Sequence, residues 1–344
     1  MKIALPTTGI ILGIESSCDE TSAAVLRNGE LASVVISSQM FHKSYGGIVP
    51  ELASRAHIKG IIPIVDEAVS KAGLSKRDIT CIAATYAPGL MGSLLVGLNF
   101  AKGLAMSLDA PLVGVHHIEA HIFSVLLEKR DTPEMPFIAL VVSGGHTLLV
   151  LVNDVGSYQI IGKTLDDAAG EAFDKVGKML ELGYPAGPII DKLAQDGNNN
   201  FITFPRPMLN DPNYDFSFSG IKTSVLYWLR DNQHLLATNL NDITASFQKA
   251  IVDVLVAKTL RAVSAYNVTD IVCVGGVSAN TELREAFTSL CKQKNMRFFS
   301  PRPLFSTDNA AMIAMLGAMK HERGSLSPLS LHAEARVPLT EVLA

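Results

Sequence analysis

The segment IILGIESSCDETSAAVL, residues 10–26, contains an apolar run, a short polar turn and a second apolar run. The segment FIALVVSGGHTLLVLV, residues 137–152, repeats this order 127 positions later. Each apolar run has the residue types of a buried strand, and each turn is rich in small and polar residues. Two such openings indicate two related α/β lobes facing each other across a cleft, although chance similarity of two hairpins would give the same pattern.

A third strand-like run, Ile271–Val274, ends at a pair of glycines and is followed by a helical pattern. Glycines directly after a strand let a ligand approach the backbone, and a helix N-terminus favours negative charge. The turns at 15–21, 143–146 and 275–280 therefore predict a nucleotide or acyl-phosphate site.

Apolar and amphipathic segments alternate along the chain, which is typical of the α/β fold class. The predicted strands are Ile10–Glu15, Ser22–Leu26, Ile79–Thr85, Leu112–Val115, Phe137–Val142, Thr147–Val152 and Ile271–Val274. The predicted helices are Glu51–Ala72, Ser93–Ser107, Ile118–Glu128, Ala168–Leu182, Gly220–Arg230, Asp242–Tyr266, Thr281–Lys294 and Asn309–Arg323.

The composition indicates a folded protein in a reducing compartment. The 344 residues are 48% hydrophobic and 18% charged, which excludes disorder and collagen, and the length suits two domains. The longest uncharged run, between Asp78 and Lys102, is broken by proline and glycines, so we expect no membrane span. The four cysteines lack paired spacing and the N-terminus lacks an export signal, so we expect a cytoplasmic location.

Charge and aromatic residues permit a nucleic-acid partner without requiring one. The net charge is −4, but positions 201–344 hold 14 basic against 12 acidic residues. The irregular segment Phe204–Lys222 mixes aromatic residues with cations, a pattern that can stack on unpaired bases. Packing of those aromatics against the protein body is the interpretation that we favour for most of them.

His117 and His121 lie four residues apart at the start of a helical pattern. This spacing puts both imidazoles on one helical face, as a divalent metal requires, although a purely structural pair is an equal alternative. Zinc peptidases use H-E-x-x-H, whereas Glu119 lies two residues from each histidine and should point to the opposite face. A peptidase mechanism therefore lacks its base.

A third ligand should be a carboxylate. Asp308 precedes an apolar helix, where an N-cap is the ordinary explanation for an aspartate. Two histidines and one carboxylate with open positions would suit Fe(II) or Zn(II) acting as a Lewis acid.

Eight blocks of sequence together carry a family resemblance. They are Gly13–Thr21, Tyr45–Arg55, Val115–His121, Val142–Thr147, Asp166–Lys175, Phe216–Lys222, Gly275–Asn280 and Ser306–Ala311. The chain resembles the catalytic subunit of tRNA N6-adenosine threonylcarbamoyltransferases of the bacterial TsaD type. The resemblance implies a two-lobed actin-like ATPase fold with ribonuclease H-like lobes and a ligand cleft between them, as in sugar kinases and Hsp70. Residues 10–122 with 309–344 would form the N-terminal lobe, and residues 123–308 the C-terminal lobe with most substrate loops.

The resemblance also implies the reaction and its partners. The enzyme would transfer the threonylcarbamoyl group from threonylcarbamoyl-AMP to N6 of adenosine 37, in the anticodon loop of tRNAs that read ANN codons, forming t6A. ATP or ADP could occupy the same nucleotide site. The implied protein partners are an inactive actin-like paralogue, a small P-loop ATPase and the synthase that makes the adenylate, with no role for a membrane.

The resemblance further implies roles for particular residues. The metal, Fe(2+) first and Zn(2+) second, would be bound by His117, His121 and Asp308. Asp19 matches an acidic position of the active cleft. The implied substrate contacts are Val141, Val142, Ser143, Gly144, Gly145, Asp174, Gly187, Asp191 and Asn280.

Three positions depart from the commonest family pattern: Ala120, Ala186 and Ser306. None removes an implied ligand, and we expect the Ala186 methyl group to affect contacts near Gly187. An actin-fold sugar kinase or chaperone-type ATPase is the alternative function, because it would share the fold. An HxxxH metallo-endopeptidase is a further alternative, opposed by the position of Glu119.

Overall fold

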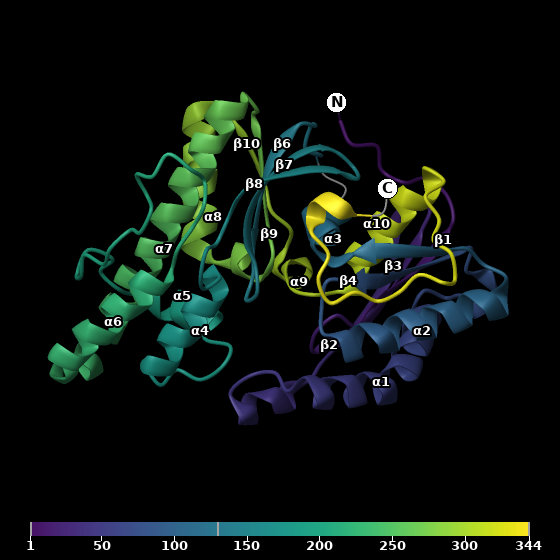
Figure 1. Ribbon diagram of the computed structural model, residues 1–344, viewed down its shortest axis with the longest axis horizontal. Coiled ribbons are helices and arrows are strands. Elements are labelled where there is room, and N and C mark those ends of the chain that lie inside the picture. The colour runs from purple at the N-terminus through teal and green to yellow at the C-terminus, as the bar shows by residue number, and fades with distance from the viewer. Residues whose placement is uncertain (1, 129–130, 343–344) are drawn as a thin grey trace. The chain divides into compact units, whose positions relative to one another are not determined.

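The computed structural model describes residues 2–128 and 131–342, which form two compact units (Figure 1). Unit 1 comprises Pro133–Asp154 and Tyr158–Ser306, and unit 2 comprises Lys2–Thr132, Val155–Ser157 and Thr307–Ala344. Asp308 therefore belongs to the same unit as His117 and His121. The lobe boundaries at 122/123 and 308/309 stay a prediction.

Unit 2 contains a mixed five-stranded sheet. Its strands are β1 Ile10–Glu15, β2 Glu20–Arg27, β3 Glu30–Ser38, β4 Cys81–Ala87 and β5 Leu112–His116, in the order β3-β2-β1-β4-β5. Strands β1, β2 and β3 pair antiparallel, whereas β4 is parallel to β1 and β5 is parallel to β4. Its α-helices are α1 Pro50–Lys71, α2 Met91–Leu108, α3 His117–Phe123 and α10 Ala310–Glu322, and its 3-10 turns are η1 Met40–Tyr45, η2 Lys76–Asp78, η3 Ser124–Glu128 and η6 Leu339–Glu341.

Unit 1 contains a second five-stranded sheet. Its strands are β6 Phe137–Val142, β7 Thr147–Asp154, β8 Ser157–Lys163, β9 Asp270–Val274 and β10 Arg297–Phe299, in the order β10-β9-β6-β7-β8. Its helices are α4 Ala169–Met179, α5 Gly187–Ala194, α6 Ser219–Asp231, η4 Gln233–Leu235, α7 Leu236–Tyr266, η5 Gly276–Ala279, α8 Thr281–Lys294 and α9 Pro303–Ser306. Read from β8 to β10, this sheet places its strands in the same relative chain order as the sheet of unit 2 read from β3 to β5. The repeated topology confirms the prediction of two related α/β units.

The structure contains elements that the sequence patterns did not predict: β3, β8, β10 and α5. β3 is an edge strand that is only partly buried, and β10 has three residues, so neither gives a strong apolar signal. Helix α7 begins at Leu236 and is kinked at Asn239, so the predicted start at Asp242 was wrong. The Asp242 carboxylate instead accepts the N–H of Asn198 at 2.8 Å.

Helix α10 lies in the core of unit 2 and is buried from Ala310 to Lys320. It packs closely on β1 because Gly13 has no side chain: a Cβ there would lie 2.4 Å from the Ala310 oxygen. Gly317 allows the same approach to β4, since its Cβ would lie 2.3 Å from that of Ala83. This close packing fixes the position of α10, whose N-cap Asn309 directly follows Asp308.

Helix α2 is long and apolar enough to cross a membrane, with a mean hydropathy of 1.3 and 33% of it buried. One such helix is weak evidence for a span, because core helices of soluble proteins have the same length and composition. In this fold α2 packs against α1 and β4.

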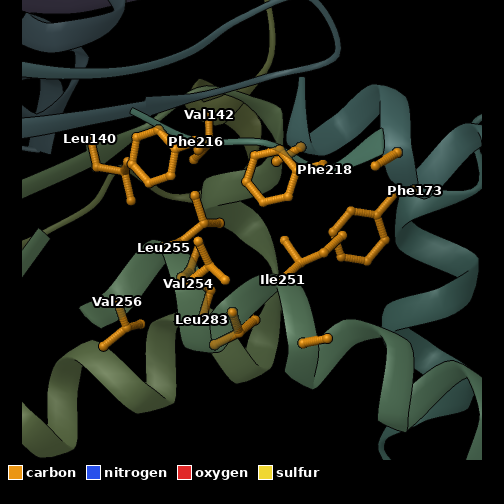
Figure 2. Packing of buried hydrophobic residues seen from close by; sticks show 14 of the residues in the cluster. Leu140, Val142, Phe173, Phe216, Phe218, Ile251, Val254, Leu255, Val256 and Leu283 are labelled. Carbon is orange, nitrogen blue, oxygen red and sulfur yellow. The ribbon is translucent and has the colours of Figure 1, made fainter. Parts of the chain in front are cut away.

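The core of unit 1 explains the aromatic residues of the irregular segment. Phe216 and Phe218 are fully buried, and Phe204 is 2% exposed. Figure 2 shows Phe216 and Phe218 among Leu140, Val142 and other apolar side chains of this core. Packing, and not stacking on bases, is therefore the role of these three rings.

Candidate functional site

Helix α3 places two histidines on one face of unit 2. Strand β5 ends at His116, whose Nδ1 accepts the N–H of Glu119 at 3.4 Å and so caps the helix. The rings of His117 and His121 follow with centroids 4.7 Å apart. The four-residue spacing thus brings both imidazoles together, as the sequence predicts.

Asp308 faces this pair. Its Oδ1 lies 3.4 Å from Nε2 of His117 and 3.0 Å from Nε2 of His121. One ligand atom from each of the three residues lies within 4.8 Å of the others. Asp308 is not the helix cap, because the Asn309 side chain accepts the N–H of Met312 at 3.1 Å. The structure thus removes the ordinary explanation for an aspartate at this position.

The donor set fits a divalent transition metal. The side chains of His117 and His121 are 10% and 2% exposed, whereas Asp308 is 26% exposed and leaves one side open. Nδ1 of His121 is buried and has no hydrogen-bond partner among residues 2–128 and 131–342. Two imidazoles, one carboxylate and an open side are the arrangement in which such metals keep positions for a substrate.

Electrostatics favour a positive charge between these residues. Burial alone would lower the pKa of His117, but the charges of Asp308 and Glu15 raise it well above the usual histidine value. Burial lowers the pKa of His121. Burial would raise the pKa of Asp308, but the charge of His117 holds it below its usual range. Two carboxylates thus favour positive charge at this position, which a bound cation would supply.

Glu119 is directed away from the histidine face, as the helical spacing predicts. Its carboxylate forms an ion pair with Lys320 of α10, at 3.0 Å, and both side chains are almost completely buried. A glutamate held in this way cannot activate a water at the histidines. This geometry opposes the peptidase alternative.

The turn between β1 and β2 carries Asp19, whose main-chain oxygen accepts the N–H of Gln39 at 3.1 Å. Burial, followed by the charges of Asp308 and Asp19, raises the pKa of Glu20 to about 9. Burial and the same two charges also raise the pKa of the Cys18 thiol. Asp19 and Asp308 thus both act on Cys18 and Glu20, the two residues that flank Asp19.

The turn after β6 in unit 1 presents backbone to solvent. Val141 and Val142 are buried strand residues, and the N–H of Ser143 donates to the His146 oxygen at 2.8 Å. A Cβ at Gly144 or Gly145 would meet nothing within 4 Å in the described structure. A ligand could approach the main chain at these glycines without a steric obstacle.

Asp174 joins α4 to the start of α5. Its carboxylate accepts the N–H of Ala186 at 2.8 Å, directly before Gly187. Burial raises the pKa of Asp174, and backbone N–H groups of Ala186 and Gly187 counteract that rise. Ala186 is fully buried, and a Cβ at Gly177 would lie 2.0 Å from its methyl group. The extra methyl group therefore packs over α4.

Asp191, in the middle of α5, contacts the start of α8, which Asn280 caps. Asp191 accepts the N–H of Thr281 at 3.0 Å and its hydroxyl at 2.8 Å. Asn280 caps α8 by accepting the N–H of Leu283 at 3.0 Å, and its amide donates to Gln248 at 2.6 Å. Sequence patterns did not predict Gln248 or Thr281, because neither belongs to a motif that signals chemistry by itself.

An apolar groove of about 480 Å³ lies between α1 and α2. Its lining includes Ile58, Ile62, Leu95 and Phe100, and it contains none of the predicted site residues.

Comparisons with known proteins agree on one family. Residues 30–315 match the family model described as TsaD: tRNA N6-adenosine threonylcarbamoyltransferase. A protein of that name from Chlorobium phaeobacteroides strain BS1 is 52% identical over 330 residues, covering 92% of this chain and 95% of its own. Another, from Riemerella anatipestifer, is 50% identical over 336 residues, covering 96% and 98%.

Solved structures support the fold. HypF from T. kodakarensis aligns with a TM-score of 0.63 at 16% identity, covering 94% of this chain and 49% of that one. Component A of (R)-2-hydroxyglutaryl-CoA dehydratase from Acidaminococcus fermentans aligns with a TM-score of 0.56 at 16% identity, covering 92% and 100%. At this identity the similarity shows the fold alone, which is the actin-like ATPase fold.

Proposed function

The chain belongs to the TsaD family of tRNA N6-adenosine threonylcarbamoyltransferases, and we propose that His117, His121 and Asp308 form the metal site of its reaction centre. It is accordingly an acyltransferase that acts on tRNA and forms t6A. The observation that carries the metal proposal is the convergence of two Nε2 atoms on one carboxylate oxygen.

We propose threonylcarbamoyl-AMP as the donor and N6 of adenosine 37, in tRNAs that read ANN codons, as the acceptor. The donor is a mixed anhydride, so its acyl group is already activated and needs no enzyme nucleophile. The protein must hold the adenylate, stabilise charge on the carbamoyl oxygen and orient the attacking amine. Adenosine 37 lies in a loop, so its base can be presented without breaking a duplex.

The predicted substrate contacts of unit 1 stay a proposal that its geometry supports. Gly144 and Gly145 can direct backbone N–H groups to the phosphate or to the developing oxyanion, because nothing crowds them. Val141, Val142 and Ser143 lead into that turn. Asp174, Gly187, Asp191 and Asn280 would contact the adenylate, and ATP or ADP could bind there too.

The metal is proposed as Fe(2+), with Zn(2+) as the second candidate. Both accept two imidazoles and a carboxylate, so the residues present do not separate them. When bound, the metal supplies Lewis-acid stabilisation of negative oxygen. His117, His121 and Asp308 hold its ligand atoms on one side, and the 26% exposure of Asp308 leaves the other side accessible.

Asp19 is proposed to take part in the reaction centre, because its charge acts on Cys18 and Glu20 together with that of Asp308. Replacement by asparagine should reduce product without removing the metal. An unchanged rate of t6A formation in Asp19→Asn would exclude this role.

Three protein partners are proposed on the strength of the family resemblance: an inactive actin-like paralogue, a small P-loop ATPase and the synthase that makes the adenylate. We propose a cytoplasmic location, where unmodified tRNA and these partners would be present.

The test mixes the purified chain and these partners with threonine, bicarbonate, ATP and unmodified tRNA. The tRNA is then digested and its nucleosides are measured by mass spectrometry. We expect t6A only when the chain is present. Absence of t6A, while a working relative's system forms it under the same conditions, would overturn the proposal. Phosphorylation of a sugar, or ATP turnover stimulated by an unfolded peptide, would favour the kinase or chaperone alternative.

A further inference from the structure

Glu15 is a second carboxylate in contact with the histidine pair, and the predicted ligand set does not include it. It is the last residue of β1 and is fully buried. Its Oε2 lies 3.0 Å from Nδ1 of His117, on the side of the ring opposite the Nε2 that faces Asp308. His117 is therefore held between two carboxylates.

The surroundings of Glu15 fix its side chain. Its Oε1 accepts the N–H of Ser17 at 2.5 Å, and its Oε2 accepts the hydroxyl of Thr85 at 2.7 Å. The backbone is fixed as well, because β1 pairs with β2 at Ser22 and with β4 through the preceding residue, Ile14. A rigid carboxylate thus faces one nitrogen of the ring.

We propose that Glu15 is a positioning residue that orients His117 for metal binding. A carboxylate only accepts hydrogen bonds, so it selects the form of His117 with a proton on Nδ1. The lone pair of Nε2 is then directed toward Asp308, where a cation would be bound. Metal-binding histidines commonly carry such a partner, and its loss weakens metal affinity roughly 10–100-fold.

The two histidines differ in this respect. Nδ1 of His121 has no hydrogen-bond partner within the described part of the chain, whereas Nδ1 of His117 contacts Glu15 and lies 3.2 Å from the Ser17 hydroxyl. Orientation by a neighbouring carboxylate is thus specific to His117. Removing Glu15 should leave the geometry of His121 and Asp308 unchanged.

The test measures binding of Co(II) to the purified, metal-free chain, by its visible absorption and by competition with a chelator. Glu15→Gln keeps the volume but leaves one oxygen to accept three donors. We expect its dissociation constant to rise roughly 10–100-fold, with an altered Co(II) spectrum. Ser16→Ala is the matched control: this buried hydroxyl in the same turn donates to the Ser93 oxygen at 2.8 Å, and its loss should leave affinity unchanged.

The outcomes separate this inference from the metal proposal on which it rests. If wild type binds Co(II) and Glu15→Gln binds it equally well with the same spectrum, only the role of Glu15 is overturned. If wild type and His117→Ala bind Co(II) equally, or neither binds it, the metal site and this inference both fail.

A measurement on wild type covers the case in which Glu15→Gln does not fold. Nitrogen-15 NMR of histidine-labelled protein saturated with Zn(II) reports which ring nitrogen is protonated. We expect a proton on Nδ1 of His117 and the metal at Nε2. Zinc at Nδ1 would overturn the inference.

Discussion

Asn309, and not its neighbour Asp308, caps helix α10. Its Oδ1 accepts the N–H of Met312, and its amide donates to the Thr307 oxygen at 2.7 Å. Because Asn309 caps α10, the Asp308 carboxylate is free to face His117 and His121. The sequence made Asp308 the ordinary N-cap candidate, and only the structure shows that Asn309 caps the helix.

Asn309→Ala should destabilise the protein by about 1 kcal/mol, because loss of an N-cap leaves backbone N–H groups unsatisfied. Asn309→Ser keeps an oxygen that can accept from Met312 and should retain most of the stability. Urea unfolding of the three proteins measures the effect. Equal stability of the alanine variant and wild type would show that the cap contributes nothing.

Asp166 gives a prediction about pH. Its carboxylate accepts the hydroxyls of Ser217 at 2.5 Å and Ser219 at 2.7 Å, and the N–H of Phe218 at 2.8 Å. Burial acts to raise the pKa of Asp166, but these hydrogen bonds lower it below the usual value of 3.8. A group with a lowered folded-state pKa stabilises the protein above its unfolded pKa, and this contribution is lost as pH falls through the folded pKa.

Asp166→Asn should therefore lower the melting temperature at pH 7, by roughly 2–6 °C. The difference from wild type should shrink as the pH falls below about 4. Thermal unfolding followed by circular dichroism across this pH range measures it. The control is Asp196→Asn, because Asp196 is exposed and its carboxylate has no hydrogen bond in the described structure. The melting temperature of this variant should differ little from that of wild type. A deficit that stays constant down to the lowest pH would contradict the account.

At the scale of elements, the ion pair of Glu119 and Lys320 joins α3 to α10 and so holds the histidines beside Asp308. Lys320→Met leaves a buried carboxylate without its cation and should cost roughly 3–5 kcal/mol in the free energy of unfolding. The double variant Glu119→Leu with Lys320→Met removes both charges and should recover most of that loss. Urea unfolding measures the free energy of unfolding of the single and the double variants. A loss in the double variant equal to the sum of the single losses would exclude a coupled pair.

Helices and strands with a strong hydrophobic periodicity could be predicted from the sequence, and weakly patterned ones could not. Strands β1 and β6 and helix α8 have the predicted bounds, because apolar runs or caps define both ends. Helix α5 was missed because its eight residues begin inside the segment Gly-Tyr-Pro-Ala-Gly-Pro, residues 183–188, which is typical of a loop. The start of α7 was misplaced because Asn239 interrupts the helix without ending it.

Some residues of the candidate site could likewise be predicted from the sequence, and others could not. The four-residue spacing predicted that His117 and His121 share a face, since helical geometry alone decides this. Glu15 could not be assigned, because its contact with His117 spans 102 positions and depends on the order of β1, β4 and β5. Similarly, Gln248 reaches Asn280 only through the packing of α7 on α8.

At the scale of the molecule, two units share one strand order but differ in the chemistry of their turns. The turn after β1 carries acidic residues, and the turn after β6 carries exposed glycines. Under the proposed function, unit 2 binds a cation, whereas unit 1 offers backbone donors to an anion. This division suits a reaction that activates a phosphate-linked acyl group.

The most direct test of this account measures bound metal and t6A product together in wild type and Asp308→Asn. Asparagine keeps the size of the side chain but removes the charge that faces both Nε2 atoms. We predict about one Fe or Zn per wild-type chain by elemental mass spectrometry, and loss of both metal and product in the variant. Full t6A formation by Asp308→Asn with no bound metal would contradict the central claim.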